Sequence, residues 1–232
     1  MSTRPVPVPR TCQAMYVVLT PRPLGVDDTL PLPSAALLRH HGTSAAALER
    51  FESLRHQRVL HHRVPVERAV DAAVELRVEA LRLAEEHDGV VVDLTVPRVL
   101  ELGSHEVSAG AASQWYVLDA AAVLDGRLQT DGLVQFGLPE LRIDDVGPGA
   151  RAVGGAVVAG IVHRLVAEWP DHDPVGPAGI TLRDIAHGLG DPQAKETPVK
   201  PVLAIDIAHD DRAQVLTATW QDDPAEVLFA GA

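Results

Sequence analysis

The sequence predicts an α+β fold, with a mixed or antiparallel sheet and long helices packed mainly on one of its faces. Two observations predict this class. Long helical patterns of apolar residues cover 66–87 and 150–169. The segments 115–130 and 201–220 instead have the apolar runs and turn residues of antiparallel hairpins.

The chain begins with a proline-rich segment, which we expect to be a flexible tail over residues 1–12. Pro5, Pro7 and Pro9 alternate with other residues, a pattern that favours an extended polyproline conformation. This segment has no apolar periodicity with which to pack, so residues 1–10 should be dispensable for folding.

The rest of the chain, 13–232, is expected to form a single α+β domain, with two sub-halves at about 13–112 and 113–232. The apolar run 15–20 predicts its first buried strand. Ser44 predicts the N-cap of a short amphipathic helix over 44–56.

Pro65 stands where a helix can begin, and the pattern over 66–87 predicts the longest helix in the chain. Its stripe of Ala and Leu side chains is wide enough to lie on a sheet. Gly89 ends this helix, and the β-branched run 89–96 predicts a central strand.

In the second half, Asp125-Gly126 between apolar residues predicts a tight hairpin turn, because both residues tolerate positive φ. The helical pattern 150–169 contains Gly154, Gly155 and Gly160, which predict a closely packed neighbouring backbone.

Two further local signals follow in the chain. Thr181 with Asp184 resembles a capping box, with aspartate in place of glutamate. The run 201–220 predicts a hairpin whose turn lies at 210–212.

Two segments together resemble uncharacterised bacterial families of the DUF4261 type. They are a helix leading into GVVVDLT, and the run DGLVQFGLPELRIDDVGPG followed by a helix of small residues. The resemblance covers about residues 60–168, and the chain departs from the family pattern in its proline-rich front, residues 1–58. It implies a fold and no established chemistry.

Composition excludes several functions. The net charge of -12, from 20 basic and 32 acidic residues, repels phosphate backbones, so we expect no nucleic-acid partner. No apolar stretch approaches a membrane span, and the N-terminus lacks a signal-like apolar region, so we expect no membrane role. The single cysteine, Cys12, cannot form an internal disulfide, which favours a reducing, cytoplasmic location.

Aspartates in the middle of three predicted strands form the sharpest candidate site. Asp93, Asp119 and Asp206 could converge on a sheet surface if these strands are neighbours, and there bind a divalent metal or share a proton. The alternative is that each aspartate points to solvent from an open sheet face. No metal site and no catalytic residue is assigned on this pattern.

Other motifs carry no site by themselves. The eleven histidines lack metal-ligand spacing, and loop runs such as 171–173 and 209–211 are rich in aspartate for local turn reasons. His163 lies in an apolar helix, where packing is the commoner role. There is no GxSxG, GxGxxG or P-loop motif, so we expect no cofactor.

Two functions remain open from sequence. The first is a non-enzymatic interaction or accessory module, because a well-formed core accompanies no recognisable catalytic pattern. The second is an enzyme or binding protein for a small metabolite, acting through loop histidines and aspartates. Under the first function the partner is an unidentified protein, and under the second it is a small molecule. Homo-oligomerisation stays open, and so does the question of whether the chain is an enzyme.

Overall fold

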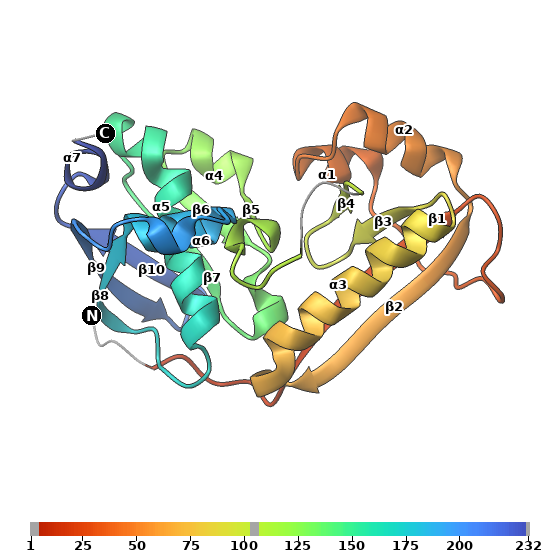
Figure 1. Cartoon of the computed structure of the whole chain (residues 1–232), viewed down its shortest axis with the longest axis horizontal. Coiled ribbons are helices and arrows are strands. Elements are labelled where there is room, and N and C mark those ends of the chain that lie inside the picture. The colour runs from red at the N-terminus through yellow and green to blue at the C-terminus, as the bar shows by residue number, and fades with distance from the viewer. Residues whose placement is uncertain (1–4, 103–106, 231–232) are drawn as a thin grey trace. The chain divides into compact units, whose positions relative to one another are not determined.

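The computed structural model describes residues 5–102 and 107–230, and it confirms the α+β class (Figure 1). The chain divides into two compact units, each with its own sheet. Unit 2 is the continuous segment Arg10–Val107, and unit 1 combines Ser108–Ala232 with Met1–Pro9. The division falls a few residues before the one expected near residue 112.

Unit 2 contains a four-stranded antiparallel sheet with the strand order β2-β1-β3-β4. The strands are β1 (Thr11–Thr20), β2 (His56–Pro65), β3 (Val90–Asp93) and β4 (Arg98–Leu100). The helices are α1 (Ala35–His40), α2 (Ala45–Ser53), the short 3-10 helix η1 (Val66–Arg68) and α3 (Ala69–Glu86).

Helices cover both faces of this sheet, because buried side chains of β1 alternate between them. On one face, Leu76 and Ala80 of α3 share a core with Tyr16. On the other, Leu38 of α1 and Leu48 of α2 pack with the neighbouring strand positions. Ser44 caps α2 as predicted, since its side chain accepts a hydrogen bond from a backbone amide of the first turn.

Unit 1 contains a six-stranded mixed sheet with the order β5-β6-β7-β10-β9-β8, in which β7 and β10 are parallel. The strands are β5 (Val117–Leu118), β6 (Leu128–Asp131), β7 (Glu140–Ile143), β8 (Gly176–Thr181), β9 (Val202–Asp210) and β10 (Val215–Trp220). The α-helices are α4 (Ala120–Leu124), α5 (Pro148–Glu168), α6 (Leu182–Leu189) and α7 (Pro224–Phe229). The expectation that the helix over 66–87 is the longest is wrong, because α5 has 21 residues and α3 has 18. The 3-10 helices are η2 (Ala112–Gln114), η3 (Leu133–Phe136) and η4 (Ala194–Glu196).

Strand β9 shows how unit 1 buries one face of its sheet. Its burial alternates strictly from Val202 to Ile207, with Leu203, Ile205 and Ile207 buried and the residues between them exposed. The predicted capping box at Thr181 starts α6, and the hairpin of β9 and β10 is also present.

The predicted tight turn at Asp125-Gly126 is wrong. Strands β5 and β6 do pair antiparallel, but α4 lies between them. Asp119 caps this helix by accepting hydrogen bonds from the amides of Ala121 and Ala122, and the alanine run favours a helical turn.

The proline-rich front differs from the expected tail of residues 1–12. Strand β1 begins at Thr11, so the last two residues of that range pair with β2. Val6 is only 5% exposed and belongs to unit 1. The physical reason is that an irregular proline-rich segment can still bury single apolar side chains without any periodic pattern.

The glycines of α5 make one close backbone approach, to α6. A Cβ on Gly188 of α6 would lie 2.1 Å from the carbonyl oxygen of Ala159, and one on Gly160 would lie 2.9 Å from Ile185. Gly155 is different, because a Cβ there would meet only Leu118 at 3.7 Å. Close packing therefore explains Gly160 and not Gly155.

Among the helices that the structure describes, none has the length and apolar character needed to cross a membrane.

Candidate functional site

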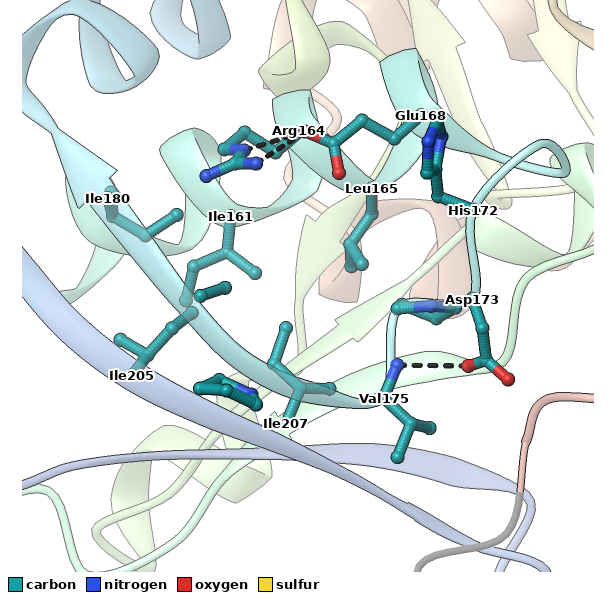
Figure 2. A pocket seen from close by; sticks show the side chains of 13 residues that line it. Ile161, Arg164, Leu165, Glu168, His172, Asp173, Val175, Ile180, Ile205 and Ile207 are labelled. Atoms are coloured by element: carbon teal, nitrogen blue, oxygen red, sulfur yellow. Dashed lines mark hydrogen bonds and ion pairs between the residues drawn. The ribbon is translucent and has the colours of Figure 1, made fainter.

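A small pocket in unit 1 lies where the end of α5 meets the edge strand β8 and its neighbour β9. Figure 2 shows isoleucines of these elements, Ile161, Ile180 and Ile205 among them, gathered on one side. Polar side chains stand on the other side, from the end of α5 and from the loop before β8. The pocket is therefore amphipathic.

The apolar floor follows from strand and helix periodicity. Ile205 and Ile207 are two residues apart on β9 and so share a face, while Ile161 and Leu165 are one helical turn apart on α5. All four are at most 6% exposed. The cavity has a volume of about 140 Å³, close to the roughly 150 Å³ cavity that is known to hold benzene.

The rim contains one guanidinium and two carboxylates. Arg164 donates to Glu168 Oε1 through Nε at 2.9 Å and through Nη2 at 2.5 Å. Its Nη1 donates to the carbonyl of Gly179 at 2.7 Å. Asp173 adds a second carboxylate, so the carboxylates of the rim outnumber its single guanidinium.

The loop between α5 and β8 holds His172 and Asp173 in place. Pro170 follows the end of α5, where a proline cannot continue the helix. The amide of His172 donates to the carbonyl of Glu168 at 3.0 Å, and Asp173 Oδ1 accepts from the amide of Val175 at 2.9 Å. This local turn presents both side chains to the pocket.

Asp93, one of the three predicted site residues, is fully buried in unit 2. Its Oδ2 lies 3.0 Å from Arg77 Nη2, and its Oδ1 accepts from the amides of Thr95 and Val96. The side chain thus neutralises an arginine of α3 and closes the turn after β3, which is a structural role.

The other two predicted aspartates lie in unit 1 in different settings. Asp119 caps α4, whereas Asp206 is exposed on β9. Over residues 5–102 and 107–230, no group of three or more His, Cys, Asp and Glu side chains could hold a metal ion. The structure therefore does not assemble the three aspartates into a metal site.

Among the histidines, His163 of α5 has the most defined surroundings. Its Nδ1 lies 3.0 Å from the carbonyl of Gly110, and its ring stacks on His187 of α6 with centroids 5.0 Å apart. Burial lowers the pKa of His163, and the hydrogen bond to Gly110 opposes this shift. The residue is packed and hydrogen-bonded, as the apolar helix suggested.

Sequence reasoning missed Arg164 and Glu168, although it considered the 171–173 loop. A signal was present, because these two residues form an i,i+4 ion pair at the end of an otherwise apolar helix.

Comparison of the chain with protein-family models, curated proteins and solved structures finds no match.

Proposed function

We propose that the chain is a small-molecule binding protein whose pocket takes an amphipathic amine with a short branched apolar group. The observation that carries this proposal is an isoleucine-rich floor beneath a rim with two carboxylates and one guanidinium. Of the two functions that the sequence left open, this proposal takes the second, an enzyme or binding protein for a small metabolite, and specifies binding.

Both carboxylates have an oxygen to offer to an ammonium group. Glu168 Oε1 accepts hydrogen bonds from the guanidinium of Arg164, and Asp173 Oδ1 accepts one from the amide of Val175. The other two carboxylate oxygens, Glu168 Oε2 and Asp173 Oδ2, have no hydrogen bond to a described residue. The wider charge favours a cation too, since residues 113–232 carry 8 basic and 18 acidic residues. The cavity volume is close to that of a cavity that holds benzene, so the apolar part can have about five or six carbons.

The proposal is tested with 3-methylbutylamine and its matched acid, 3-methylbutanoate, by thermal melts and titration calorimetry. The amine should raise the melting temperature by mass action, and the acid should not. Asp173→Asn should weaken amine binding about threefold, as expected for one exposed ion pair. Glu168→Gln combined with Asp173→Asn should weaken it further.

Asp171→Asn is the matched control, because Asp171 lies in the same loop but does not line the pocket. It should leave amine binding unchanged. Ile205→Phe should fill the floor and abolish binding while the protein stays folded by circular dichroism. Equal binding of the acid and the amine, or unchanged binding by the double variant, would overturn the proposal.

We also propose a cytoplasmic location and keep the DUF4261-type resemblance as a prediction. The location rests on the single free cysteine, Cys12, which is buried in β1. Burial also raises the pKa of its thiol, so it is a weak nucleophile.

A further inference from the structure

Strand β2 forms an edge of the sheet in unit 2 and pairs with β1 along one side only. In an antiparallel pair, every second residue directs its N–H and C=O away from the partner strand. On β2 these are the odd-numbered residues. The carbonyl of Gln57 accepts from the amide of Asp28 at 3.1 Å, and the amide of Val59 donates to Asp28 Oδ2 at 2.8 Å.

The loop around Asp28 therefore covers only the first half of this edge. In the second half, the carbonyl of Val59 and both backbone polar groups of His61 and Arg63 face outward. No described residue forms a hydrogen bond with these groups. The side chains of His61 and Arg63 are exposed as well, so this stretch of edge is open to a partner.

The edge strand β8 in unit 1 is blocked by comparison. Pro177 has no N–H to offer, the carbonyl of Gly179 accepts from Arg164, and the amide of Thr181 donates to Asp184 Oδ2 at 2.8 Å. In unit 2, the short edge strand β4 has its Val99 amide bound to Thr43 Oγ1 at 3.1 Å. Because β8 and β4 are covered in these ways and the second half of β2 is not, the open half of β2 is the candidate docking surface.

The charge of β2 is opposite to that of the chain as a whole. Its ten residues include three histidines and two arginines but no acid, whereas the net charge of the chain is -12. Arg58, in the covered half, lies 3.9 Å from Asp28. Arg63 donates to Thr11 Oγ1 at 3.1 Å and forms no ion pair with a described residue.

We propose that the open half of β2, residues 59–63, binds an extended acidic segment of a partner protein by strand addition. Backbone hydrogen bonds to His61 and Arg63 would supply affinity, and acids at alternate positions of the segment would lie over those two side chains. A second copy of β2 offers histidines and arginines but no acid to this edge, so it lacks the charge complementarity of an acidic segment.

The experiment uses the full chain and a fluorescein-labelled ten-residue peptide alternating glutamate and valine, with a lysine–valine peptide as the matched probe. Fluorescence anisotropy should show saturable binding of the acidic peptide that weakens with added salt. His61→Pro removes an outward N–H without touching a hydrogen bond to β1, and it should weaken binding at least about tenfold. Arg63→Glu should do the same through charge.

Arg22→Glu is the control for charge reversal, since Arg22 is exposed in a loop of the same unit. It should leave binding unchanged. Circular dichroism and melts verify folding, and Arg63→Glu decides the matter if the proline variant does not fold. The proposal is overturned if neither peptide binds, if the lysine peptide binds equally well, if Arg63→Glu binds like wild type, or if sedimentation shows a dimer that Arg63→Glu dissociates.

Discussion

The imidazole of His209 lies on the covered face of β9, where it is only 6% exposed. Neither ring nitrogen has a hydrogen-bond partner among the described residues. Burial of unpaired polar atoms costs free energy, and this cost disappears when an apolar side chain of similar size takes their place.

We therefore expect His209→Leu to raise the free energy of unfolding by about 1 kcal/mol or more. Urea denaturation at neutral pH measures this change. The control His61→Leu, at an exposed position of β2, should alter stability by less than about 0.5 kcal/mol. A clear loss of stability in His209→Leu would mean that the ring has a partner in solution.

Glu140 of β7 is a partly buried carboxylate with a specific set of donors. Its Oε2 accepts from Thr130 Oγ1 at 2.7 Å, and its Oε1 accepts from the amides of Gly132 and Leu133. Desolvation by burial raises the pKa of Glu140, and these hydrogen bonds only partly oppose the shift. The folded state thus holds the proton more tightly than the unfolded state does.

Because of this difference, ionisation of Glu140 lowers the free energy of unfolding as pH rises above 4.5, the ordinary value for the pKa of a glutamate. Glu140→Gln should remove that part of the pH dependence, so its stability relative to wild type should increase from pH 4 to pH 7. Denaturant melts across this range test the sign. The exposed Glu79→Gln should run parallel to wild type, and a Glu140→Gln curve that also ran parallel would contradict the assignment.

At the scale of elements, the contact of α5 with α6 depends on glycine. The backbones approach so closely at Gly188 that a methyl group would overlap the carbonyl of Ala159. Gly188→Ala should therefore destabilise the protein by at least about 1–3 kcal/mol, through overpacking. Gly155→Ala, on the same pair of helices but without a close neighbour, should be neutral or stabilise by up to about 1 kcal/mol. Equal effects of the two substitutions in urea melts would refute the distinction.

The elements that the sequence predicted best are helices whose first turn is capped by a nearby side chain. Ser44 and Thr181 cap their helices through hydrogen bonds within a few residues, so the signal and the structure lie together. Asp125-Gly126 misled because the turn signal competes with a second local signal, the cap at Asp119. The choice between them depends on the packing of α4.

The pocket could not be predicted in the same way. Its floor joins Ile161 to Ile205, which come together because α5 packs on β8 and β8 pairs with β9. Pairing of strands separated by a long segment is not encoded in any short window. The loop residues His172 and Asp173 were visible as candidates, but their partner groups were not.

At the scale of the whole molecule, the first described residues complete a unit made mostly of the second half of the chain. Val6 is 5% exposed, whereas Val8, two residues later, is 54% exposed. Val6→Ser should lower the free energy of unfolding of unit 1 by about 2 kcal/mol, and Val8→Ser should have little effect. Hydrogen exchange resolved by peptide should locate the Val6 effect in unit 1. If hydrogen exchange is the same in the two variants, the segment containing Val6 and Val8 is a flexible tail, as the sequence predicted.

The discontinuity of unit 1 also fixes the order in which a nascent chain can fold. The residues of unit 2 leave the ribosome as one uninterrupted run, from Arg10 to Val107. The segment containing Val6 leaves before unit 2, and the rest of unit 1 emerges only after unit 2 has been synthesised. At ordinary elongation rates this delay is on the order of 10 s. Residues synthesised before unit 2 are thus built into the fold after it.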